Sequence, residues 1–567
     1  SICLLDPRPE LPTIVDMVEH AFRLSEASNM PSMLELRIRT CHVHGHFTAS
    51  DNAHPKISRN NPASAADFDL GKVSLPPATY TQEKHKIEHR LPAAIKYISE
   101  NGLNESLAGD VPEIGVIVQG GIYNTLMRAL HQFGLADVYG QARLPIFVMN
   151  VTYPLVPDEL VRFCAGKDAV LVVEEGQPDY IEQALHAILR KADVNTVLAG
   201  KDVLPMGGEY TSEVMIRGLA GFLEKHAPPP LQIGPAVSRM TQLLAEKDQA
   251  KADLGTDYPL RQPSFCTGCP ERPIFSAIKI LERELGPTHV SADIGCHTFA
   301  ALPPFNVGHT VMGYGLGLAS SAGLRPNMDK RVLSIMGDGG FWHNGISSGV
   351  AAAQANGNDA VLMVIQNGYT SATGWQKLPS SATDRHGKTP DMSIHKAMKG
   401  LGVGWIRTVR TYSIATMIKT LREAMTTAQG GLKVIIADGE CQLARQRRIR
   451  PQIAKQLADG DRVVRTRFGV DDDVCTGDHS CIRLSGCPSI TIKPSPDPLR
   501  TDPVAHVNND CVGCGVCGEV AHAAVLCPSF YEARIVQNPG WYDRLLERVR
   551  RAVIARLAPQ PAVPSES

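Results

Sequence analysis

Residues 332–374 read VLSIMGDGGFWHNGISSGVAAAQANGNDAVLMVIQNGYTSATG, and they decide the fold of the domain around them. The apolar runs at 332–336 and 361–366 have the length and the β-branched content of buried strands. A helix is predicted between them, beginning near Gly345. Strands that alternate with helices favour a parallel α/β sheet. Ligands are expected at the carboxyl edge of such a sheet, where both runs end in polar residues.

The two strand ends carry the oxygen ligands that Mg²⁺ prefers. Asp338 offers a carboxylate and Asn367 an amide oxygen, and we place a third ligand at the backbone carbonyl of Tyr369. The neighbouring glycines would let the backbone approach a diphosphate closely; they are Gly337, Gly339 and Gly340. GDGG alone could equally be a tight turn. Together with the strand, helix, strand and Asn367, however, it resembles the thiamine-diphosphate binding motif.

The 14 cysteines are unevenly placed, and seven of them fall between Cys475 and Cys527. The N-terminal residues show no secretory signal, so we expect a reducing, cytoplasmic compartment, in which grouped thiolates indicate metal or cluster ligands rather than disulfides. The run CVGCGVCGEVAHAAVLCP has the C-x2-C-x2-C spacing that holds an iron–sulfur cluster. A zinc site is the less typical alternative for three such close cysteines followed by Cys-Pro.

An upstream run, CTGDHSCIRLSGCP, is the partner of this segment. In two-cluster ferredoxins the Cys that precedes Pro ligates the other cluster. This rule predicts two sets: Cys487 with Cys511, Cys514 and Cys517, and Cys475 with Cys481 and Cys527. Asp478 stands where the second set would have a further Cys. Either Asp478 supplies an oxygen ligand to a fourth iron, or that iron is absent and the cluster is [3Fe-4S].

A further set, called the first set below, lies in the domain of Asp338, and it comprises Cys266, Cys269, Cys296 and Cys441. A cluster there would lie beside a thiamine ring and accept electrons singly. The alternative is that these are core or turn cysteines, because free Cys is commonly buried. His297 follows Cys296 and could hydrogen-bond the diphosphate or a reacting oxygen, although a structural role is the alternative.

The segments FCTGCPERPIFSAIK, DIGCHTFAALPP, MGYGLGLASSAG and GDGGFWHNGI, with the cysteine-rich tail, resemble the alpha part of indolepyruvate:ferredoxin oxidoreductase. The resemblance is strongest to the long bacterial form in which subunits are fused. It implies oxidative decarboxylation of an arylpyruvate with coenzyme A, and transfer of electrons to ferredoxin. The implied cofactors are thiamine diphosphate, Mg²⁺ and up to three [4Fe-4S] clusters. Gly313 in MGYGLGL, with Cys296 and His297, is expected to lie at the cofactor.

The resemblance also implies a multidomain α/β architecture. The expected parts are the end of a pyrimidine-binding domain (1–50), a linker (51–109), a transketolase C-terminal-like domain (110–225), a linker (226–262), a diphosphate-binding domain (263–455), a two-cluster ferredoxin-like domain (466–535), and a C-terminal helix and tail (536–567). The family's activating Glu has no match in these residues, and its gamma-type domain or subunit is expected to be a partner. We also expect a homodimer or a larger assembly.

Two other functions are compatible with the sequence. The chain could be a non-oxidative decarboxylase with structural clusters, or an electron-transfer subunit of a larger complex. The Asp338–Asn367 pattern argues against the second, and the paired cysteine runs argue against the first. The balance of 57 Lys and Arg against 58 Asp and Glu gives no case for nucleic acid, and no apolar run predicts a membrane span.

Overall fold

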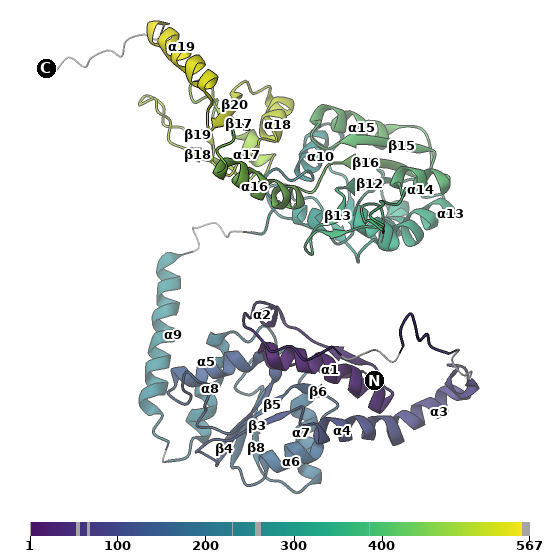
Figure 1. Cartoon of the computed structure of the whole chain (residues 1–567), viewed down its shortest axis with the longest axis vertical. Helices are drawn as coiled ribbons and strands as arrows, with labels where there is room; N and C mark the ends of the chain where they lie inside the picture. Colours follow the sequence, from purple (N-terminus) through teal and green to yellow (C-terminus); the bar gives the residue numbers. More distant parts are fainter. Residues whose placement is uncertain are drawn as a thin grey trace, which may run out of the picture. The chain divides into compact units, whose positions relative to one another are not determined.

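The computed structural model describes residues 2–52, 57–64, 69–229, 231–255, 262–384 and 386–557. Contacts within the chain divide it into two compact units, Ser1–Pro259 and Leu260–Ser567 (Figure 1). Each unit is an α/β structure with its own hydrophobic cores. Among the described residues, no helix combines the length and the apolar content that crossing a bilayer requires.

The first unit is built on a five-stranded sheet in the order β3-β5-β4-β7-β8. Its strands are β3 (Glu105–Leu107), β4 (Ile114–Gln119), β5 (Ile146–Met149), β7 (Ala169–Val173) and β8 (Val197–Ala199). All but the edge strand β3 are parallel. One face packs on α5 (Tyr123–Gln132) and α8 (Ser212–His226), and the other on α6 (Pro157–Cys164) and α7 (Tyr180–Lys191). The predicted alternation of strands and helices is confirmed here.

A smaller sheet brings the N-terminal residues into the same unit. It has the order β2-β1-β6, and its strands are β1 (Cys3–Leu5), β2 (Ser32–Leu34) and β6 (Val151–Tyr153). The helices α1 (Leu11–Ser28) and α4 (Leu91–Glu100) lie side by side over it and bury Leu24, Ala94 and Ile98 (Figure 1). The short helix α2 (Ile38–Cys41) follows β2.

Both predicted linkers are wrong in part. Residues 51–109 include a continuous helical stretch, α3 (Ala78–His85), a π-helical turn (Lys86–Arg90) and α4, before strand β3. Residues 226–262 include the 21-residue helix α9 (Gly234–Leu254), which buries Val237, Met240 and Leu244 in the core of the first unit. Widely spaced apolar residues anchor these helices, and the polar residues between them concealed that pattern.

The second unit contains a six-stranded, all-parallel sheet in the order β10-β9-β11-β12-β16-β15. Its strands are β9 (Val290–Ala292), β10 (Thr310–Val311), β11 (Leu333–Gly337), β12 (Val361–Gln366), β15 (Trp405–Arg410) and β16 (Lys433–Asp438). One face packs on α10 (Arg272–Leu285) and α15 (Ile414–Thr426), and the other on α11 (Gly317–Leu324) and α14 (Ile394–Gly400). The predicted parallel sheet is confirmed, including the bounds of β12.

The helix after β11 begins earlier than predicted. It starts directly at Asp338 with α12 (Asp338–Gly340), continues as a π-helix (Phe341–Ala351) and ends as α13 (Ala352–Ala355). Gly345 lies inside it, and a Cβ there would come within 2.2 Å of the Met336 sulfur. The glycine therefore permits close packing of the helix on β11 and does not mark a helix start.

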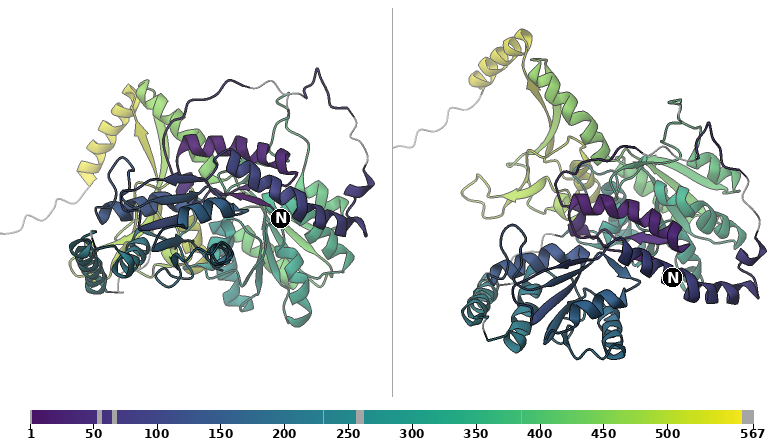
Figure 2. Two further views of the ribbon diagram at one scale, coloured as in Figure 1. Left: turned by 90° about the horizontal axis from the view of Figure 1, so that it is seen from below. Right: turned by 60° about the horizontal axis from the view of Figure 1, so that its bottom comes forward.

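The cysteine-rich segment forms two antiparallel strand pairs and two helices. The long pair is β17 (Val463–Val470) with β20 (Phe530–Gln537), and the short pair is β18 (Ile490–Lys493) with β19 (Val504–Val507) (Figure 2). Its helices are α17 (Ser480–Arg483) and α18 (Val516–Val525), and α18 packs on α10 and α15. The helices α16 (Gln442–Ala458) and α19 (Trp541–Leu557) flank the segment; the predicted tail beyond 557 lies outside the described residues.

Candidate functional site

A cavity of about 730 Å³ lies at the carboxyl ends of β9, β11 and β12. Eight of the residues predicted to bind cofactor line it: Gly337, Asp338, Gly339, Gly340, Asn367, Tyr369, Cys296 and His297. Among the residues described, Gly313 is outside this lining, next to Tyr314, which does belong to it. The structure therefore brings the predicted site together, except for Gly313.

Two glycines keep this part of the cavity open. A Cβ on Gly339 would lie 2.0 Å from the Tyr314 hydroxyl, and a Cβ on Gly340 would lie 2.0 Å from Asp293 Oδ2. Neither distance is compatible with any side chain at these positions. The first helical turn after β11 is therefore exposed to the cavity as bare backbone, as a closely bound diphosphate requires.

Asp338 is buried at the start of this turn. Its carboxylate accepts hydrogen bonds from Gly339 N at 2.9 Å and from Gly368 N at 2.6 Å. Burial nevertheless raises its pKa to about 7, against the lowering effect of these backbone donors. A carboxylate in this state gains from a nearby cation, which would restore its ionised form.

Asn367 connects the cavity wall to a neighbouring acid. Its Oδ1 accepts from Tyr369 N and Ser371 Oγ, each at 3.1 Å, and its Nδ2 donates to Glu271 Oε1 at 3.3 Å. Ser371 Oγ also donates to the carbonyl of Tyr369 at 3.3 Å. The two oxygens predicted as ligands, Asn367 Oδ1 and the carbonyl of Tyr369, therefore both contact the hydroxyl of Ser371.

Glu271 is the main residue of the cavity that the sequence analysis missed. It is buried, burial raises its pKa to about 7, and its Oε2 has no hydrogen-bond partner among the described residues. The signal in the sequence was an acid between Pro270 and the apolar first turn of α10. Its burial against Asn367 depends on a contact between residues 96 positions apart, which no local pattern reveals.

His297 is fixed by an acid that the sequence analysis also missed. Its Nε2 lies 2.6 Å from Asp293 Oδ1, and Gly315 N donates to Asp293 Oδ2 at 2.9 Å. Burial opposes the charge of His297, but the hydrogen bond and the charge of Asp293, with the charge of Glu271, raise its pKa. The imidazole is therefore held against Asp293 in the wall of the cavity.

These residues fit Mg²⁺ bound together with a diphosphate. Two buried carboxyl groups, one with an unpartnered oxygen, need a cation to ionise, and the bare turn accepts the phosphate oxygens. Over the described part of the chain, no three His, Cys, Asp or Glu side chains lie close enough to hold a metal ion alone. Mg²⁺ suits this arrangement because it takes amide, carbonyl and phosphate oxygens as ligands.

The first cysteine set adjoins the cavity. Cys296 is in the cavity wall, and its pKa is raised to about 12 by burial and then by the charges of Glu271, Cys441 and Cys266. The backbone N of Cys441 donates to the carbonyl of Asn367 at 3.0 Å. Cys269 is fully desolvated, and its pKa is raised by burial and by the charges of Glu271 and Cys266. The structure therefore brings these four thiols into one neighbourhood beside the cofactor pocket.

The second set lines a small pocket of about 330 Å³. Its members are Cys487, Cys511, Cys514 and Cys517, in the grouping predicted by the crossing rule. Burial raises the pKa of the Cys517 thiol, and the neighbouring thiols Cys487, Cys514 and Cys511 raise it further. Four thiols are the number of ligands that a cubane cluster takes, although among the described residues no three of them lie close enough to hold a single metal ion.

The third set is Cys475, Cys481 and Cys527. Burial raises the pKa of Cys481 to about 12, with further contributions from the charges of Cys527 and Cys475. The carboxylate of Asp478 has other partners: Oδ1 accepts from Ser480 N at 3.0 Å, and Oδ2 accepts from Ser480 Oγ at 2.6 Å. These bonds cap α17 and favour a three-thiolate site.

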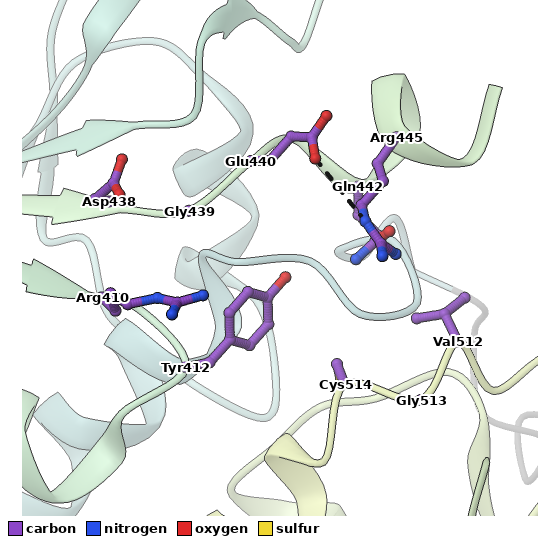
Figure 3. A pocket seen from close by; sticks show the side chains of 10 residues that line it. All are labelled: Arg410, Tyr412, Asp438, Gly439, Glu440, Gln442, Arg445, Val512, Gly513 and Cys514. Carbon is purple, nitrogen blue, oxygen red and sulfur yellow. Dashed lines mark ion pairs between the residues drawn. The ribbon is translucent and has the colours of Figure 1, made fainter. Parts of the chain in front are cut away.

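The loops that carry the first two sets touch each other. Gly268, between Cys266 and Cys269, has a φ of +73°, and a Cβ there would lie 2.3 Å from Val512 Cγ2. Tyr412 Oη donates to the carbonyl of Gly268 at 2.8 Å. Figure 3 shows Tyr412 and Gln442 facing Cys514 across a polar cavity of about 810 Å³. The pocket-side cysteines and the cysteine-rich segment are thus in direct contact within the second unit.

The family model described as thiamine pyrophosphate enzyme, C-terminal TPP binding domain, matches residues 293–437. Indolepyruvate oxidoreductase subunit IorA of Methanothermobacter thermautotrophicus is 27% identical over 529 residues, which are 91% of this chain and 75% of that protein. The subunit IorA of Pyrococcus abyssi is 25% identical and covers 89% and 74% of the two chains. A 2-oxoglutarate:ferredoxin oxidoreductase structure from Magnetococcus marinus matches 33% of this chain and 67% of its own, at 18% identity and a TM-score of 0.29.

The matched thiamine pyrophosphate domain contains Asp338 and Asn367, which line the cavity described above, and Asp293, which contacts His297 in the cavity wall. The similarity to the IorA subunits extends over both units. The resemblance of this chain to indolepyruvate oxidoreductase alpha subunits is therefore confirmed, and residues 293–437 of its second unit match the C-terminal domain of thiamine pyrophosphate enzymes.

Proposed function

We propose that this chain carries out thiamine-diphosphate-dependent oxidative decarboxylation of an arylpyruvate, such as indolepyruvate, with coenzyme A. The products are an aryl-acetyl-CoA and carbon dioxide, and the two electrons leave through iron–sulfur clusters to ferredoxin. The name of the IorA relatives supports the substrate class. The acting protein would include the pyrimidine-binding domain and the gamma-type part that the resemblance implies, as a homodimer or a larger assembly.

One observation carries this proposal: Cys296 is part of the wall of the cofactor pocket, and the backbone N of Cys441 donates to the carbonyl of Asn367, another residue of that wall, at 3.0 Å. A pocket for thiamine diphosphate alone would suit a simple decarboxylase. A cluster bound by the thiols at its wall would instead accept the electrons released when the substrate carbon is oxidised. This juxtaposition favours an oxidoreductase over a non-oxidative decarboxylase and over a pure electron carrier.

Each group has a defined task in this scheme. Asp338, Asn367 and the carbonyl of Tyr369 would hold Mg²⁺, and Gly339 and Gly340 would give the diphosphate access to the backbone. When bound, thiamine diphosphate supplies the carbanion chemistry that releases carbon dioxide from a 2-oxoacid. Its activating Glu would come from the pyrimidine-binding domain.

His297 and Glu271 control protons at the pocket wall. Asp293 fixes the ring of His297 through Nε2, so the imidazole can donate a hydrogen bond only in one orientation. Glu271 is held by Asn367 through Oε1 and leaves Oε2 unpartnered beside the cation site.

The cysteine sets would hold three clusters in series. We propose [4Fe-4S] clusters at Cys266, Cys269, Cys296 and Cys441, and at Cys487, Cys511, Cys514 and Cys517. At Cys475, Cys481 and Cys527 we propose a [3Fe-4S] cluster, because this set has three thiols and the carboxylate of Asp478 turns to Ser480 at the start of α17. The contact between Gly268 and Val512 would let electrons pass from the first cluster to the second.

An anaerobic assay of coenzyme-A-dependent viologen reduction tests the function. Indolepyruvate, phenylpyruvate and pyruvate are compared in parallel with the complete protein, and the products are separated to detect acyl-CoA and aldehyde. We expect reduction with the two aromatic substrates and little with pyruvate. Release of aldehyde without viologen reduction would favour the decarboxylase, and no reaction with any substrate would contradict the proposal.

A further inference from the structure

A buried arginine lies among the thiols of the second cysteine set. Arg272 is the first residue of α10, and none of its surface is exposed. Its Nη1 donates to the carbonyl of Ser485 at 3.2 Å, while Nε and Nη2 have no hydrogen-bond partner among the described residues. A buried guanidinium with free donors is strongly unfavourable, so a negative acceptor is expected at this position.

The groups around the guanidinium are thiols rather than carboxylates. Arg272 lines the same small pocket as Cys487, Cys511, Cys514 and Cys517. The adjacent acid, Glu271, points instead to Asn367. The sulfur atoms are therefore the acceptors available to this arginine.

Arg272 also stands between two cysteine sets. Cys269 belongs to the set beside the cofactor pocket, whereas Cys487 and Cys514 belong to the set of the C-terminal segment. The peptide from Cys266 to Cys269 leads directly into α10, and Gly268 on it packs against Val512. The buried positive charge of Arg272 thus lies at the junction where an electron would pass.

We propose that Arg272 donates hydrogen bonds to the sulfurs of the cluster at Cys487, Cys511, Cys514 and Cys517, and thereby raises its reduction potential. This inference rests on the proposed function. One electron leaves the pocket-side cluster, which is oxidised, and reduces this cluster; no bond or proton moves. Reduction adds one negative charge, which a buried guanidinium and its hydrogen bonds stabilise. Arg272 therefore positions the second cluster as the acceptor for electrons from the pocket.

Two substitutions of Arg272 and a matched control test this role. The holoenzyme and its Arg272→Gln, Arg272→Lys and Arg283→Gln variants are titrated anaerobically, with electron paramagnetic resonance reporting each cluster's midpoint potential. Arg283 is an exposed residue of the same helix. We expect Arg272→Gln to weaken reduction of the second cluster at least tenfold, which is 59 mV for one electron. Arg272→Lys should cause a smaller decrease, and Arg283→Gln none. An unchanged potential in an iron-replete Arg272→Gln protein would overturn the inference.

A measurement on the unmodified protein covers the case in which the variants lose iron. Protein labelled with guanidino-¹⁵N arginine is reduced, and pulsed electron paramagnetic resonance is used to search for ¹⁵N coupling to the second cluster. A ¹⁵N coupling that persists in the labelled Arg283→Gln protein does not arise from Arg283, and it supports the assignment to Arg272. If the unmodified protein shows no ¹⁵N coupling, the inference is refuted. Absence of any cluster signal in the iron-reconstituted unmodified protein would contradict the proposed function itself.

Discussion

The Asp338→Asn substitution tests two effects of this buried acid on the free energy of unfolding. One is the cost of ionising the carboxyl group without a cation, and the other is the stabilisation that a bound cation provides. Asp338→Asn keeps the shape of the side chain and removes its ionisation. The carboxylate accepts hydrogen bonds from Gly339 N and Gly368 N through its two oxygens, and an amide can accept only through one. One of these bonds is therefore lost, at a cost of about 1–3 kcal/mol that does not depend on pH.

The dependence on pH follows from the raised pKa. Burial raises the pKa of Asp338 from near 4 to about 7, so the folded protein holds this proton at a pH where the unfolded chain has released it. Stability due to this acid is complete below pH 4 and is lost as the pH rises to 7. Between pH 5 and pH 7 the loss is about 3 kcal/mol, at 1.36 kcal/mol for each pKa unit. Coupling to Glu271 makes this an upper bound.

Urea unfolding of the cofactor-free protein, followed by tryptophan fluorescence, measures this effect. The free energy of unfolding of Asp338→Asn, relative to the unmodified protein, should rise by up to about 3 kcal/mol between pH 5 and pH 7. The exposed Asp391→Asn substitution serves as the control. With Mg²⁺ and thiamine diphosphate added, the unmodified protein should become the more stable of the two, because the variant lacks a ligand for the cation. A difference that does not change with pH would refute the assignment of Asp338 as a buried, cation-dependent acid.

Three further changes test the other parts of the site. Gly340→Ala would place a Cβ 2.0 Å from Asp293 Oδ2 and should weaken thiamine-diphosphate binding at least tenfold by calorimetry; binding unchanged by the substitution would show that the turn does not hold the cofactor. Cys487→Ser should remove about four iron atoms per chain, measured colorimetrically, whereas Cys41→Ser should remove none. Asp478→Asn should leave the iron content unchanged, and a loss of iron would mean that this carboxylate is a ligand after all.

The strands of the fold could be predicted because their sequences are continuous and β-branched. The run at 361–366 is followed by the polar Asn367 and a glycine, and it has the predicted bounds. The helix after Asp338 could not be placed, because Gly345 resembles a helix boundary until Met336 is seen packed against it. Polar composition also hid the helices at 78–100, because residues 78–90 bury no side chain and α4 buries only Ala94 and Ile98.

The candidate site was predictable where ligands follow a local spacing. Asp338 and Asn367 stand at the ends of adjacent parallel strands, so the pattern alone placed them together. Glu271 and Arg272 were missed because their roles come from contacts between distant parts of the chain, and Asp293 was missed because its contact with His297, four residues later, depends on the turn between them. Burial changes what these three residues can do, and burial of a single charged residue leaves no periodic signal in the sequence.

The central claim is that oxidation at the thiamine-diphosphate pocket reduces iron–sulfur clusters in the same unit. Freeze-quench electron paramagnetic resonance of the complete protein, mixed anaerobically with indolepyruvate, tests it most directly. Signals of a reduced cluster should appear when substrate is added, and they should increase when coenzyme A is present. Clusters that stay oxidised while the substrate loses carbon dioxide would contradict the account.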